Sequence, residues 1–161
     1  MSSLVKLSRA VNQWIEYVLF GLGLSMSIIV AVQVFCRYVL NHSLFWSEEL
    51  ARYLLVWLTF LGASVAYYRS VHPGIDVIYA RMPDTIRKVA AVTVHLLSIT
   101  LFLVMIIFGI KFAYFIRHQI SPALYLPKWL VFAIIPLSGT VLMLHGLIFF
   151  LDEIKGKGRD S

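Results

Sequence analysis

The sequence predicts an all-α integral membrane protein with four transmembrane helices. Of its 161 residues, 60% are hydrophobic and 14% are charged, whereas a soluble domain is about 25% charged. The mean hydropathy is +0.85. The apolar residues gather in four stretches, each near the roughly 20 residues that a helix needs to cross a bilayer. An open strand cannot satisfy its backbone in lipid, so each stretch is expected to be a helix. This composition excludes an ordinary soluble enzyme and a disordered chain.

We expect a single membrane domain over residues 1–161. Its spans are expected at approximately 15–36, 50–68, 89–110 and 129–151. The first span follows the N-terminus and is too long for the core of a cleaved signal peptide, so it is expected to be an uncleaved signal anchor. Pro136 should kink the fourth span, because proline lacks an amide hydrogen and crowds the preceding turn.

The distribution of Lys and Arg predicts that the N and C termini are cytoplasmic. Nine of the 14 basic residues lie in the N-terminal segment, the middle loop and the tail, and five lie in the other two loops. Cytoplasmic loops carry the excess of positive charge. The middle loop contains the turn His72-Pro73-Gly74, which is expected to lead into a surface-lying amphipathic segment. The basic residues are scattered, so no nucleic-acid partner is expected.

The loop between the first two spans ends in a predicted helix start. Ser47 is expected to cap the second helix, with Glu48 and Glu49 in its first turn, where the helix dipole favours negative charge. Glu48 and Arg52 are four residues apart, which favours an ion pair. Trp46 stands where an interfacial aromatic residue belongs.

The loop before the fourth span is shaped by two prolines. Pro122 is expected to keep this loop extended, and Pro127 is expected to be the first residue of the fourth helix.

Two intramembrane histidines are the first candidates for chemistry. His95 lies six residues into the third span, and His145 lies six residues from the end of the fourth. Both are about 9 Å inside the same membrane boundary, at about 1.5 Å per residue. Two readings stay open: neutral imidazoles that hydrogen-bond to neighbouring helices, or a pair that relays protons or binds haem. Gln33, an amide within the first span, is expected to bond to a neighbouring helix.

Small residues at helical spacing indicate close helix packing. Gly62 and Ala66 are four apart in the second span, and Gly139 and Gly146 are seven apart in the fourth. Cys36 is the only cysteine, which excludes a multi-cysteine metal site. No catalytic residue, metal or cofactor is expected.

Two longer motifs are more specific than these spacings. The first is WSEELARY at residues 46–53, followed by VWLTFLGA at 56–63 and then His72 and Asp76; the second is SPALYLPKW at 121–129, followed by Pro136. Together they resemble the small permease subunit of tripartite ATP-independent periplasmic (TRAP) transporters. The resemblance covers approximately residues 10–152.

The resemblance implies a non-catalytic scaffold in the bacterial inner membrane, surrounded by lipid and paired with a large multi-span permease subunit. It also implies a periplasmic substrate-binding protein that docks on the pair, and import of organic acids, of the dicarboxylate or sialic acid type, driven by a sodium gradient. Residues that match the family at the outer face are expected to form the partner or docking interface: Trp46, Glu48, Glu49, Arg52, Ser121, Pro122 and Pro127.

Two other functions are weighed against this one. A haem-binding membrane anchor of a quinone oxidoreductase would use His95 and His145 as axial ligands. A small four-span exporter would need a carboxylate within the membrane, and Glu16, at the start of the first span, is too peripheral for that role.

Overall fold

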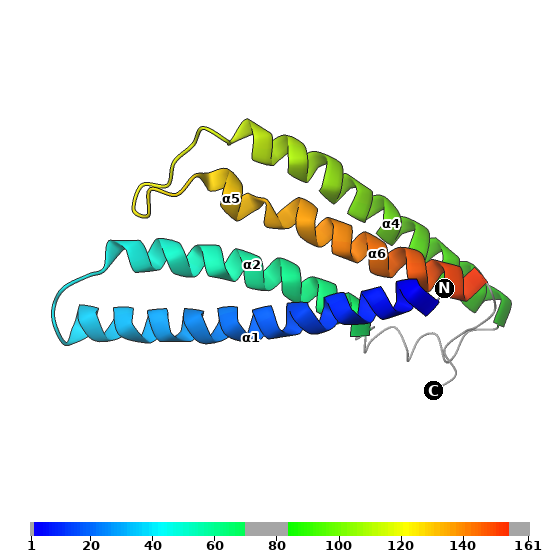
Figure 1. The fold of residues 1–161 in the computed structure, drawn as a ribbon, viewed down its shortest axis with the longest axis horizontal. Coiled ribbons are helices and arrows are strands. Elements are labelled where there is room, and N and C mark those ends of the chain that lie inside the picture. Colours follow the sequence, from blue (N-terminus) through cyan, green and yellow to red (C-terminus); the bar gives the residue numbers. More distant parts are fainter. Residues whose placement is uncertain (1, 70–83, 155–161) are drawn as a thin grey trace.

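The computed structural model describes residues 2–69 and 84–154. Its helices are α1 (Ser2–Tyr38), α2 (Phe45–Arg69), α4 (Asp84–Phe115), α5 (Lys128–Phe132) and α6 (Ile134–Ile154). Figure 1 shows an elongated bundle in which α1 lies beside α2, and α4 lies beside α5 and α6. The two pairs meet where α2 packs against α6.

The bundle has two distinct ends. The N-terminus and the last turn of α6 lie together at one end, here called the terminal end (Figure 1). Residues 39–44 and 116–127 connect helices at the other end, here called the loop end. The expected amphipathic segment, with His72 and Asp76, lies outside the described residues.

The predicted fold class is confirmed. The described residues contain four helical stretches long and apolar enough to cross a membrane, at Lys6–Tyr38, Phe45–Arg69, Val92–Phe115 and Lys128–Leu151. The expected spans 15–36, 50–68 and 89–110 fall inside α1, α2 and α4, and 129–151 is divided between α5 and α6. Many large apolar side chains are exposed on the bundle, as expected where the solvent is lipid.

The fourth membrane helix is interrupted near Pro136, as the sequence predicts. α5 ends at Phe132 and α6 begins at Ile134. Pro136 has no amide hydrogen to donate to the carbonyl of Phe132, four residues earlier, and its ring crowds that turn. The backbone is stabilised locally, because Ala133 donates to the carbonyl of Trp129 at 2.8 Å.

Two expected helix starts are wrong, by three residues for α2 and by one residue for α5. α2 begins at Phe45, so Ser47 lies inside its first turn, where its hydroxyl donates to the carbonyl of Leu44 at 2.6 Å instead of capping the helix. Pro127 is the N-cap of α5 rather than its first helical residue, because it is extended (ψ 124°) and pairs with Ile120 in a β-bridge.

Glycines allow α4 and α6 to approach closely. A Cβ added at Gly109 would lie 2.9 Å from Cδ of Pro136, and one at Gly139 would lie 3.1 Å from Cγ1 of Ile106. A Cβ added at Gly146 would lie 3.1 Å from the Phe102 ring. A Cβ at Gly62 would meet nothing within 4 Å, and the packing role of Gly62 and Ala66 stays a prediction.

Candidate functional site

Glu49 is the centre of a polar cluster at the loop end. It lies in the first turns of α2, and only 6% of its surface is exposed. One carboxylate oxygen accepts the backbone N–H groups of Ala123 (2.9 Å) and Leu124 (3.2 Å). The other accepts the hydroxyl of Tyr53, one helical turn along α2, at 2.5 Å. Glu49 therefore joins the start of α2 to the loop between α4 and α5.

That loop is held by its own backbone as well. The N–H of Ser121 donates to the carbonyl of Leu126 at 2.9 Å, and the N–H of Lys128 donates to the carbonyl of Gln119 at 2.9 Å. The hydroxyl of Ser121, a buried residue, accepts from the N–H of Leu124 at 3.3 Å. We call residues 119–128, with Glu49 and Tyr53, the Glu49 cluster.

Tyr125 stands at the tip of this loop in an unusual conformation. Its φ is 54°, in the left-handed region where a bulky residue is an outlier. Its side chain is 80% exposed. Such backbone conformations persist only where the surrounding structure enforces them, and here the hydrogen bonds of the Glu49 cluster do so.

Glu48 faces a different neighbour from the one expected. Its carboxylate accepts the side-chain amide of Gln33 at 3.1 Å and lies 3.8 Å from the guanidinium of Arg37. Within the described residues its ion pair is thus with α1, and not with Arg52. Both groups of the Arg37–Glu48 pair are about half exposed. Trp46 and Arg52 are also exposed. Pro122 is exposed too, on the loop that Glu49 holds.

A second polar group joins α1 to α2 and α6 at the terminal end. The hydroxyl of Ser8 lies 2.8 Å from Nδ1 of His145, which is fully buried. The His145 ring packs on Tyr68, with 5.0 Å between the ring centres. His95 packs edge-on against Phe150, with 6.4 Å between the ring centres. For His145, the contact with Ser8 of α1 fits the reading of an imidazole that hydrogen-bonds to a neighbouring helix. The other reading, that His95 and His145 relay protons or bind haem as a pair, stays a hypothesis.

An ion pair reinforces this junction about two turns further along α1. Arg69 lies 2.8 Å from the carboxylate of Glu16, which also accepts the side-chain amide of Asn12 at 2.7 Å. The described residues hold no group of three or more His, Cys, Asp or Glu side chains arranged for a metal ion.

Sequence reasoning missed several of these partners. Tyr53 lies one turn after Glu49, a spacing that indicates a possible bond. Asn12 lies one turn before Glu16, which is the same spacing. Ser8 bonds to His145, 137 residues later, and no local pattern in the sequence indicates that pairing. Gly109 and Ala113 are four residues apart, a small-residue spacing that was overlooked, and the contact of Gly109 with Pro136 appears only once α4 and α6 are packed.

Comparison with known families identifies the chain. The model of the DctQ component of tripartite ATP-independent periplasmic transporters matches residues 26–156. The chain belongs to the DctQ family. This match includes the whole of the Glu49 cluster and at least part of every membrane helix. A multi-pass membrane protein is what both the DctQ family and the four helices indicate.

Individual relatives match the chain over shorter stretches and at modest sequence identity. The chain is 35% identical over 107 residues to the sialic acid TRAP transporter permease protein SiaT of Haemophilus influenzae, covering 66% of this chain and 17% of the relative. It is 34% identical over 77 residues to a putative TRAP transporter small permease protein of the same species, covering 48% of each. It is 31% identical over 103 residues to the C4-dicarboxylate small permease protein DctQ of Rhodobacter capsulatus, covering 62% of this chain and 45% of the relative. The matches thus span less than half the length of these relatives.

Proposed function

We propose that this DctQ protein is the non-catalytic small membrane subunit of a transporter that imports organic acids across the bacterial inner membrane, driven by a sodium gradient. The observation that carries the proposal is the family match over residues 26–156. Substrates of the dicarboxylate or sialic acid type are proposed because relatives bear the names of sialic acid and C4-dicarboxylate transporters.

The proposed role is that of a scaffold. Glu49 joins α2 to the loop before α5 at one end, and Ser8, His145, Glu16 and Arg69 join α1 to α6 and α2 at the other. A bundle held at both ends suits a fixed element against which another subunit moves. The partner that moves is proposed to be a large multi-span permease.

The loop end is the proposed docking surface for a periplasmic substrate-binding protein. This assignment follows the predicted orientation, with both termini in the cytoplasm. Trp46, Glu48 and Arg52 are exposed there. The Glu49 cluster fixes the neighbouring loop, which includes Ser121, Pro122 and Pro127, in one conformation. A pre-formed surface loses less conformational entropy on binding.

Reconstitution tests the proposed function. Native membranes should yield the chain together with a large permease, and proteoliposomes should take up organic acid only when both membrane subunits, the binding protein and an inward sodium gradient are present. Uptake by the chain alone would contradict the scaffold role, and uptake that ignores sodium would contradict the coupling.

The haem-anchor alternative has a simple test of its own. His145 is fully buried, and Tyr68 covers its ring, so a haem could reach it only if this packing changed. A visible spectrum of the purified chain with an intense Soret band would support the alternative. A spectrum that lacks this band, after expression with haem supplied, would reject it.

A further inference from the structure

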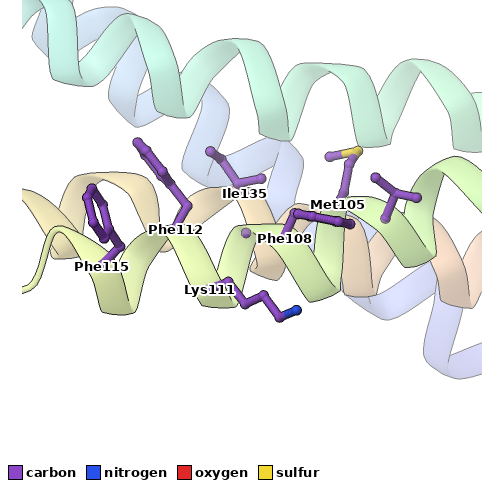
Figure 2. A pocket seen from close by; sticks show the side chains of 8 residues that line it. Met105, Phe108, Lys111, Phe112, Phe115 and Ile135 are labelled. Atoms are coloured by element: carbon purple, nitrogen blue, oxygen red, sulfur yellow. The ribbon is translucent and has the colours of Figure 1, made fainter.

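An apolar groove runs along α4 near the loop end. Its volume is about 630 Å³, within the range of roughly 300–1,000 Å³ that is usual for small-molecule sites. Its lining includes Val104, Phe108, Lys111, Phe112 and Phe115 from α4 and Ile135 from α6. Figure 2 shows Phe108, Phe112 and Phe115 following one another along α4, with Phe115 nearest the loop end and Ile135 of α6 beside them.

The side chains of this groove favour a thin, flexible occupant over another helix. Membrane helices that pack closely are enriched in small residues at their interface. Gly109 is the small residue here, and Pro136 and Ile135 already fill the space beside it, at 2.9 and 3.1 Å from the position of a Cβ. The rest of the lining consists of larger side chains, three of them phenylalanines. A hydrocarbon chain fits between such side chains without a close backbone approach.

Lys111 supplies the one charge in the groove. Its ammonium group lies 5.5 Å from the centre of the Phe108 ring, and the ion pairs found among the described residues involve other side chains. The middle of the span Val92–Phe115 is about 11 Å from Lys111, at about 1.5 Å per residue. The hydrocarbon layer extends about 15 Å from its centre. A lysine side chain at this depth reaches the headgroup level.

We propose that this groove binds one anionic phospholipid from the leaflet at the loop end. An acyl chain lies along Val104 and Phe108, parallel to α4, and the phosphate pairs with the ammonium group of Lys111. The charge of the headgroup complements the lysine, and the length of groove on the membrane-centre side of Lys111 takes the chain. This inference does not depend on the transport role.

The test is lipid retention by the purified full-length chain, measured by native mass spectrometry. Micelles would contain either palmitoyl-oleoyl-phosphatidylglycerol or palmitoyl-oleoyl-phosphatidylcholine. We expect one tightly held phosphatidylglycerol on the wild type. Lys111→Gln should lower its retention about fivefold, the factor that corresponds to one lysine near an anionic membrane surface. Val104→Trp, which fills the groove, should lower retention of both lipids.

Lys128→Gln is the matched control, because it removes the same charge at the loop end outside the groove. It should leave retention unchanged within about twofold, since the lost attraction is not at the site. Equal losses for Lys111→Gln and Lys128→Gln would overturn the proposal in favour of general surface attraction. Displacement of the lipid by inorganic phosphate would also overturn it, because the acyl chain would then add nothing. A photo-crosslinker placed at Phe112 that reacts in native membranes with another protein, and not with lipid, would overturn the proposal as well. Circular dichroism of each variant checks that the helices are intact.

Discussion

Glu49 shows how one side chain organises a loop far away in the sequence. Its two oxygens accept donors from Tyr53 on the same helix and from Ala123 and Leu124, 74 and 75 residues later. Carboxylate bonds to N–H groups are stronger than bonds between neutral groups. The neighbouring Glu48 is exposed and bonds to α1, so adjacent carboxylates serve different parts of the bundle.

We predict that Glu49→Ala loosens residues 119–128 without unfolding the helices. The N–H of Ala123 loses its acceptor, so hydrogen exchange at Ala123 and Leu124 should become about tenfold faster, because opening of the loop now costs less free energy. Glu48→Ala is the control and should leave both amides unchanged. Equal exchange in Glu49→Ala and the wild type would show that the backbone bonds of the loop suffice.

At the scale of the helices, glycines of α4 and α6 stand at a tight contact, whereas a glycine of α2 does not. Gly109 and Gly139 lie against side chains of the facing helix, whereas Gly62 on α2 has open space beside it. A methyl group at Gly109 would force a neighbouring atom to move, one at Gly139 would need its neighbours to give by a few tenths of an ångström, and one at Gly62 has room.

We predict that Gly109→Ala destabilises the protein by about 1–3 kcal/mol, the usual cost of forcing extra atoms into packed contact. The Pro136 ring cannot move away easily, because its backbone nitrogen is also only 3.0 Å from the new Cβ position. Thermal unfolding in detergent would measure the change. Gly62→Ala, the same substitution in open space, should be neutral or stabilising by up to about 1 kcal/mol. A reversed order of the two melting temperatures would contradict the packing seen here.

The helices were predictable from the sequence, while their ends and contacts were not. Long apolar stretches depend on local composition, so all four membrane helices could be located. Ser47 has the chemistry of an N-cap, yet α2 begins two residues earlier. The bonds of Glu49 and His145 cross 74 and 137 residues, and no local pattern specifies such distant partners. Glu48 was expected to pair within its own helix, but Arg37 of α1 is the residue that the fold brings to it.

For the whole molecule, the exposed charges at the loop end contribute little to stability, and we propose that they act in assembly. Glu48 and Arg37 are about half exposed, and exposed ion pairs contribute little to folding. In the proposed complex they would face the binding protein or the large permease, where a complementary charge speeds association and selects the partner.

We predict that Glu48→Gln combined with Arg52→Ala lowers reconstituted uptake severalfold and makes the remaining uptake less sensitive to salt, because charge steering is lost. The melting temperature of the isolated chain should stay within about 2 °C of the wild type. A Lys6→Gln variant, at the terminal end, serves as the control for a general loss of charge. Normal assembly and normal uptake in the double variant would remove these residues from the docking surface.

The long-range bonds at both ends of the bundle can form only late in biosynthesis. The hairpin of α1 and α2 is translated before residues 119–128 and His145. Until then Glu49 lacks the N–H groups of Ala123 and Leu124, and Ser8 lacks the imidazole. The first hairpin is therefore unfinished at both ends while the second is being made. A nascent chain that stalls after α4 presents the carboxylate of Glu49 without its backbone donors, and the last segment to be made completes the first.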